Sequence, residues 1–146
     1  MPQTAFRPNH MHIAWHDYTS HDATLPISAA PLREKASVIG RTGLMLLSCG
    51  TGAWRVRSSM NELSELMGVT CTVDIGLMSI NYTCFDGDNS FSQSLCLTNT
   101  GVNTSQLNRL EKFVSDFQEK YLPESCDKIH TALDEIQRIH GLYSPL

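Results

Sequence analysis

The sequence lacks the features that mark several classes of protein. Its five cysteines are odd in number and form no CxxC pair, which argues against a disulfide framework or a zinc ribbon and favours buried, reduced thiols. No apolar run approaches the about 20 residues of a membrane span. The N-terminus lacks the basic-then-apolar order of a signal peptide. We therefore expect the chain as given to be soluble.

The sequence also lacks an excess of positive charge. Its 11 Lys and Arg stand against 15 Asp and Glu, a net charge of -4 with His neutral. Nucleic-acid-binding domains present a basic patch or stripe, so no nucleic acid is expected as a partner. The 146 residues suit one domain, and a hydrophobic content of 41% is enough for a core.

Histidine is concentrated at the N-terminus. Residues 1–31 hold four of the six His and four of the six Pro, with little periodicity, which predicts a flexible His-rich arm. If the segment were helical, His12 and His16 would share a face, and together with His10 they are candidate ligands of a divalent metal. A metal-binding module is therefore one alternative function, and a solvated arm is the other interpretation. No cofactor is predicted.

Two helices are predicted after this segment. Residues 31–50 place apolar side chains at helical spacing between a proline suited to a first turn and a glycine suited to a stop. Residues 53–67 repeat the pattern up to a further glycine. Gly40 and Gly43 lie inside the first helix, where each costs about 1 kcal/mol relative to Ala. We therefore expect both to allow close packing against another helix.

The periodicity then changes to alternation. Residues 71–75, 78–84 and 90–97 alternate apolar with polar side chains, and the DGDN sequence before the last run is a hairpin turn signal. Helical spacing returns from Leu107 to Phe117 and over 123–140. The order predicts an α+β fold of two helices, a small antiparallel sheet of about three strands, then two helices, with the helices packed on one face of the sheet.

The sequence CGTGAWRVR connects the first two helices. It lacks the GxxxxGK[ST] motif and follows no strand, so its glycines form either a loose phosphate nest or a tight interhelical turn. Arg55 and Arg57 lie near the start of the second helix, where a cation opposes the helix dipole. We therefore expect carboxylates or a bound anion beside them.

No catalytic constellation is apparent. Nucleophilic catalysis needs a nucleophile, a base and an orienting group. Outside the first 31 residues the only histidines are His130 and His140, and no spacing links either to a given Cys or Ser. We predict that the protein is not an enzyme. The alternative, a hydrolase-like domain using His130 or a Cys, requires a pocket that joins His130 to a nucleophile.

Taken in order, several stretches resemble the N-terminal domain of the threonine/serine exporter family, which includes two-component members implicated in dicarboxylate export. These stretches are SCGTGAWRVRSSMNELSELMG, CTVDIGLMSINYT and NTGVNTSQLNRLEKFVSDF, followed by a last helix before GLYSP, and they lie within Ala36–Leu146. The positions that match the family pattern are Gly50, Trp54, Arg55, Val56, Met60, Leu63, Gly68, Gly101, Val102 and Asn103. Gly52 and Arg57 stand where the family commonly has acidic residues, so no acidic role carries over to them.

The resemblance implies a function and a location. Residues 32–146 are expected to form a soluble domain at the cytoplasmic face of the cell membrane, cut before the transmembrane helices of an exporter of threonine and serine or of dicarboxylates. Its role would be assembly, gating or cargo sensing. The expected partners are the transmembrane half of the same or a neighbouring protein, further copies in a homo-oligomer, and a small carboxylate or amino-acid ligand. The residues expected to contact a ligand or a neighbouring subunit are Gly50, Gly52, Trp54, Arg55, Arg57 and Asn103.

Overall fold

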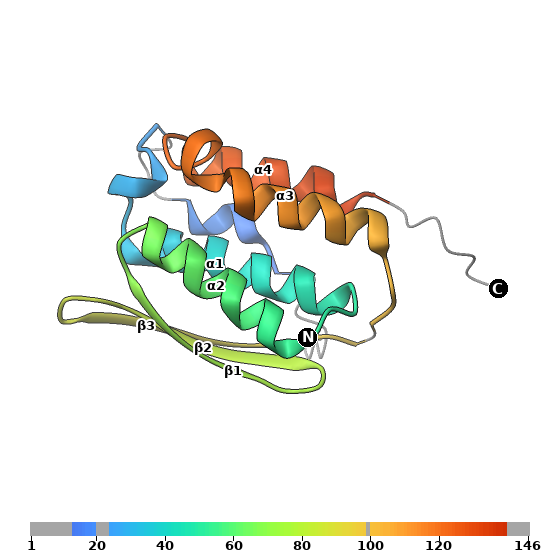
Figure 1. Ribbon diagram of the computed structural model, residues 1–146. Helices are drawn as coiled ribbons and strands as arrows, with labels where there is room; N and C mark the ends of the chain where they lie inside the picture. The colour runs from blue at the N-terminus through green and yellow to red at the C-terminus, as the bar shows by residue number, and fades with distance from the viewer. Residues whose placement is uncertain (1–12, 20–23, 99, 140–146) are drawn as a thin grey trace, which may run out of the picture.

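The computed structural model describes residues 13–19, 24–98 and 100–139 (Figure 1). Four α-helices and a three-stranded antiparallel sheet lie within these residues, in the predicted order. The elements are α1 (Leu32–Ser48), α2 (Ala53–Leu66), β1 (Thr70–Ile75), β2 (Ser79–Asp86), β3 (Asn89–Cys96), α3 (Thr104–Lys120) and α4 (Cys126–Gln137). The predicted α+β fold is confirmed.

The elements form three layers (Figure 1). The sheet has the strand order β1-β2-β3, and α1 and α2 pack directly on one of its faces. The helices α3 and α4 pack on α1 and α2, on the side away from the sheet. Alternation places Ile80, Tyr82, Cys84 and Leu95 in the core. The opposite face of the sheet carries polar side chains.

Helix α1 lies at the centre of the molecule, and every residue from Glu34 to Leu47 is buried. A Cβ built on Gly43 would lie 2.4 Å from Met60 Sδ of α2, so Gly43 does allow close packing against another helix. A Cβ built on Gly40 would lie 2.3 Å from Tyr82 Oη. The prediction was therefore wrong for Gly40, because this glycine faces the sheet.

The described part of the N-terminal segment, residues 13–19 and 24–31, packs on the helices. It forms two short 3₁₀ helices, η2 (Trp15–Tyr18) and η3 (Ile27–Ala29). Trp15 is 5% exposed and Ile27 is 0% exposed. The Ile27 N–H donates to the Glu124 carbonyl at 2.7 Å. Isolated large apolar residues give no periodic pattern, yet they still add to the core.

The last helix begins later than its predicted start at residue 123. Ser125 is the N-cap of α4, and its hydroxyl accepts from the Lys128 N–H at 3.3 Å. A serine in this position satisfies a backbone donor that the helix itself leaves free. The cap therefore sets the first residue of α4 at Cys126.

Candidate functional site

Gly50 and Gly52 form the turn between α1 and α2. Gly50 has a φ of +87°, in the left-handed region that favours glycine, and its N–H donates to the Leu47 carbonyl at 3.1 Å. Gly52 is the N-cap of α2, and its carbonyl accepts from the Arg55 N–H at 3.1 Å. This geometry is that of a tight interhelical turn, the second of the two interpretations of these glycines, and not that of a phosphate nest.

Trp54 and Arg55 lie on the first turn of α2. The Trp54 side chain is 69% exposed, and the guanidinium carbon of Arg55 lies 5.4 Å from the centre of its ring. Arg55 also forms an ion pair with Glu111 of α3. A carboxylate was one of the two partners expected for this arginine. Both side chains remain partly exposed, at 45% and 36%, and such pairs contribute only about 0–1 kcal/mol.

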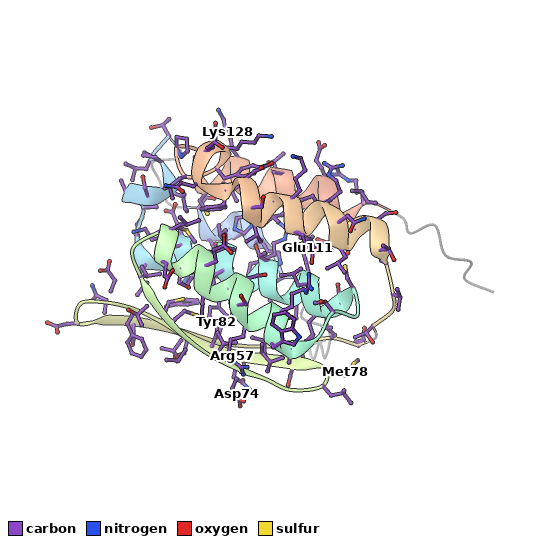
Figure 2. All side chains as sticks on the ribbon, viewed as in Figure 1. Arg57, Asp74, Met78, Tyr82, Glu111 and Lys128 are labelled. Carbon is purple, nitrogen blue, oxygen red and sulfur yellow. The ribbon has the colours of Figure 1, made fainter. Side chains whose placement is uncertain are left out.

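A groove of about 350 Å³ lies between α2 and α3 beside this ion pair. Figure 2 shows Glu111 directed from α3 toward α2. The groove combines a guanidinium, two carboxylates, three hydroxyls and an aromatic ring. Its lining residues are Trp54, Arg55, Ser58, Ser59, Glu62, Glu111, Val114 and Ser115. A volume above about 300 Å³ is enough for a small ligand.

The other two expected contact residues lie outside this groove. Arg57 lines a neighbouring hollow of about 530 Å³ on α2, and it has no ion-pair partner among the residues that the structure describes. Asn103 is the N-cap of α3, where its Oδ1 accepts from the Gln106 N–H at 2.9 Å. Its Nδ2 donates to the Ile139 carbonyl at 3.2 Å. Asn103 thus connects the start of α3 to the residues that follow α4.

Sequence reasoning missed a buried polar cluster around His130. The His130 Nε2 lies 2.9 Å from Ser37 Oγ, and Arg41 Nη1 lies 3.2 Å from His130 Nδ1. Arg41 also donates to Asp134 at 2.6 Å and to Gln137 at 2.9 Å. These partners are 89 to 96 residues apart in the sequence. The available signal was Arg41, the one charged residue of α1 after Lys35.

The cluster fixes the tautomer of His130. Because a guanidinium can only donate, Nδ1 must accept from Arg41 and Nε2 carries the proton. Ser37 Oγ therefore accepts from His130 and donates to the Glu34 carbonyl at 2.7 Å. Burial and the nearby Arg41 lower the pKa of His130 to about 3. In this arrangement His130 has no free nitrogen to take a proton from Ser37, and both side chains are 0% exposed.

His16 connects the N-terminal segment to α4. Its Nδ1 lies 2.6 Å from Asp127 Oδ1, and its Nε2 lies 2.7 Å from Asp134 Oδ2. Hydrogen bonds to Asp134 and Asp127 raise the pKa of His16. The other two metal candidates, His10 and His12, lie outside the described residues. Within the part of the chain that the structure describes, no group of three or more ligating side chains is placed to hold a metal ion.

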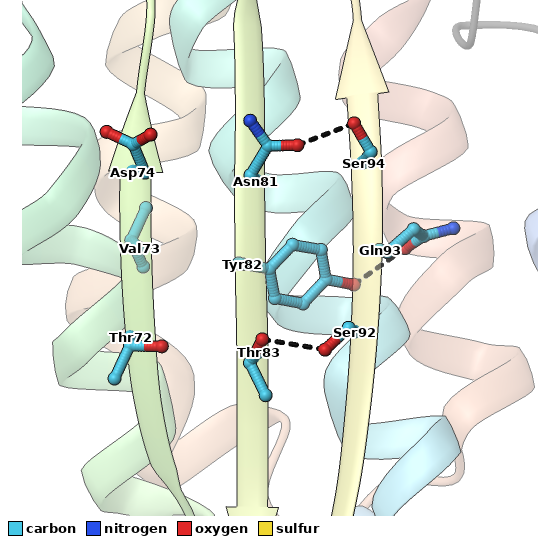
Figure 3. A pocket seen from close by; sticks show the side chains of 9 residues that line it. All are labelled: Thr72, Val73, Asp74, Asn81, Tyr82, Thr83, Ser92, Gln93 and Ser94. Carbon is cyan, nitrogen blue, oxygen red and sulfur yellow. Dashed lines mark hydrogen bonds between the residues drawn. The ribbon is translucent and has the colours of Figure 1, made fainter.

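The outer face of the sheet carries an open hollow of about 590 Å³ (Figure 3). Its outward side chains largely satisfy one another. The Ser94 hydroxyl donates to Asn81 Oδ1 at 2.5 Å, and the hydroxyl oxygens of Thr83 and Ser92 lie 2.7 Å apart. Asp74 is the one charged residue in its lining. This hollow therefore offers a charged ligand fewer unpaired partners than the groove between α2 and α3.

Comparison with known proteins identifies the family of this chain. Residues 37–146 match the model of the family described as "Putative threonine/serine exporter". No curated protein and no solved structure matches the chain. Among the helices that the structure describes, none is both long enough and apolar enough to cross a bilayer. Because the family match covers more than half of the sequence, the chain belongs to the threonine/serine exporter family.

Proposed function

We propose that this chain is a cargo-sensing domain of a threonine/serine exporter, and that the groove between α2 and α3 binds the amino acid. One observation carries this assignment: Arg55, Glu111 and Trp54 converge in a single groove of an exporter-family chain. Transport itself belongs to membrane-spanning segments of the same or a neighbouring protein. The domain acts on them from the cytoplasmic face of the membrane, as a binding module without a reaction of its own.

The groove suits the two charges of a free amino acid. The α-carboxylate can pair with two of the guanidinium nitrogens of Arg55. The α-ammonium can pair with Glu111 while it lies over the face of Trp54. The Arg55–Glu111 pair is exposed and costs little to open, and a bound zwitterion supplies a new partner to each side. The hydroxyls of Ser58, Ser59 and Ser115 are available to the side-chain hydroxyl of threonine or serine.

The charge balance of the groove favours an amino acid over a dicarboxylate. Two carboxylates, Glu62 and Glu111, line it together with a single guanidinium. A dicarboxylate would satisfy Arg55 with one end and bring its other end near a glutamate. A zwitterion brings one charge of each sign. We therefore assign threonine or serine as the ligand, and succinate serves as the discriminating probe.

Calorimetric titration with L-threonine, L-serine and succinate tests this assignment. We expect heat of binding from the two amino acids at millimolar concentrations and none from succinate. Arg55→Gln and Glu111→Gln each remove a charge-assisted hydrogen bond worth about 1.5–3 kcal/mol, so each should weaken binding about tenfold or more. Lys112→Gln is the matched control, because Lys112 lies next to Glu111 on α3 but pairs with Asp116 at 3.0 Å.

Two outcomes would contradict the assignment. The groove is not an amino-acid site if neither threonine nor serine produces heat with the folded wild-type domain. It is a general carboxylate site if succinate binds as well as threonine and Glu111→Gln strengthens that binding. A loss of binding in Lys112→Gln equal to that in Arg55→Gln would place the ligand elsewhere on α3.

A further inference from the structure

Several chain connections meet at one end of the molecule, at the right of Figure 1. The Leu97 N–H donates to the Met78 carbonyl at 2.8 Å, which joins the end of β3 to the β1–β2 turn. The Gly101 N–H donates to the Ser48 carbonyl at 3.3 Å, which joins the β3–α3 connection to the α1–α2 turn. The end of α4 lies there too, through the bond from Asn103 described above. We call this region, which includes the β1–β2 turn, the Leu77 end.

Exposed apolar side chains gather at the Leu77 end. Leu77 is 91% exposed, Trp54 69% and Val102 66%, and each comes from a different connection or helix start. Figure 2 shows Met78, which is half-buried, at the same end. The remaining large apolar residue that is exposed in the described part is Phe85, at 41%, beside the β2–β3 turn at the opposite end. Single scattered apolar residues are normal, whereas exposed apolar side chains grouped at one end of a molecule make that end a candidate interaction surface.

The charges near this end include several free cations. Arg57, Arg109 and Arg138 are exposed and have no ion-pair partner among the described residues. They lie toward the ends of α2, α3 and α4 that face the Leu77 end. The β2–β3 turn at the other end carries Asp86 and Asp88 instead. Among the described residues, three of the four exposed arginines without an ion-pair partner therefore lie toward the apolar end, and the fourth, Arg33, lies at the start of α1.

We propose that the Leu77 end rests on the surface of a phospholipid bilayer and inserts Leu77 and Val102 among the headgroups. Arginine can keep its apolar stem in the headgroup zone while its guanidinium binds phosphate. The chain belongs to an exporter family, and exporters act at a membrane, so a bilayer surface is available as the partner. Asp74 and Glu135 partly offset the nearby arginines, so apolar insertion supplies most of the affinity and anionic lipid adds to it.

Flotation with vesicles of phosphatidylcholine, with and without phosphatidylglycerol, tests this contact. We expect the domain to float with both kinds of vesicle and more completely with the anionic ones. Leu77→Glu should weaken partitioning about tenfold or more, because it removes the most exposed apolar side chain and adds a negative charge. Phe85→Glu is the matched control at the other end and should float like the wild type. Arg57→Gln combined with Arg138→Gln should reduce flotation with the anionic vesicles alone.

The contact would be overturned by absence of flotation of the wild type, or by equal loss in Leu77→Glu and Phe85→Glu. Light scattering supplies a further outcome: if the domain is dimeric in solution and Leu77→Glu makes it monomeric, the patch binds a second copy and not lipid. Leu77 does not line the groove between α2 and α3. Threonine binding should therefore be unchanged in Leu77→Glu, and the two proposals fail or stand separately.

Discussion

Replacing Gly40 with alanine tests how closely α1 approaches the sheet. A Cβ built on Gly40 lies 2.3 Å from Tyr82 Oη, 2.5 Å from Cζ and 2.7 Å from Cε1. Carbon atoms in ordinary contact are about 3.5–4.0 Å apart, so the helix or the ring must move by about 1 Å. The ring has little freedom, because Tyr82 is 2% exposed and its hydroxyl lies 2.9 Å from the Ala36 carbonyl oxygen and 2.7 Å from Gln93 Oε1.

The expected cost follows from three contributions. Alanine favours a helix over glycine by about 1 kcal/mol. Overpacking a core costs about 1–3 kcal/mol, and separating the buried Tyr82 hydroxyl from its hydrogen-bond acceptor costs about 1–3 kcal/mol more. We therefore expect Gly40→Ala to lower the free energy of unfolding by about 3 kcal/mol. Gly43→Ala is the matched comparison and should cost about 1 kcal/mol, because its Cβ meets the flexible thioether of Met60.

Urea unfolding followed by circular dichroism measures both variants by linear extrapolation. The double variant Gly40→Ala/Tyr82→Phe removes the closest atom but keeps Cζ at 2.5 Å, so it should recover only part of the loss. If Gly40→Ala is as stable as the wild type, or more stable, helix propensity outweighs the contact. The close approach of α1 to Tyr82 would then be refuted.

Three further outcomes can be measured on the same domain. Folding lowers the pKa of His130 from 6.5 to about 3. The contribution of His130 to stability is therefore fully present above pH 6.5 and is lost at about 1.4 kcal/mol per pH unit as the pH falls from there toward about 3. Urea unfolding across that range should show this slope, and His130→Gln should reduce it. Asn103→Ala should cost about 1 kcal/mol through loss of the α3 cap, and Asn103→Asp, which keeps the cap acceptor, should cost less in the same assay. Burial raises the pKa of Cys49 to about 11, so mass spectrometry after treatment with a thiol reagent should find the half-buried Cys71 modified before Cys49; modification of Cys49 first would contradict its burial.

The order of the elements could be predicted from local signals. The predicted strand 71–75 agrees with β1 to within one residue, because apolar and polar side chains alternate along a strand that is buried on one face. The end of α1 was predicted from Gly50, which does take a positive φ. The start of α4 was placed too early, because a proline suits both the first turn of a helix and the residues just before the N-cap. Pro123 lies before the cap. Local sequence does not decide between such neighbouring solutions.

The partners of the candidate site could not be predicted in the same way. Glu111 lies 56 residues from Arg55, and the sequence indicated only that a carboxylate or an anion should be nearby. The His130 cluster was harder still to predict from local sequence, since Ser37 and Arg41 come from α1 and His130 from α4. Only the packing of α1 against α4 brings these side chains together. Sequence periodicity predicts which face of a helix is buried and leaves open what that face meets.

The His130 cluster and the groove between α2 and α3 are both polar, but burial separates their roles. The Trp15 ring stacks on His130 with centroids 6.0 Å apart, and the His16 ring lies 5.8 Å from it. These rings cover the cluster, and Arg41 directs its donors at His130, Asp134 and Gln137. Breaking a buried network of this kind is costly, about 3–5 kcal/mol when one charged partner is removed, so a ligand could not enter at small cost. The Arg55–Glu111 pair is exposed and can exchange partners at a small cost in free energy. Ligand binding is therefore assigned to the groove, and the alignment of α1, α4 and η2 to the His130 cluster.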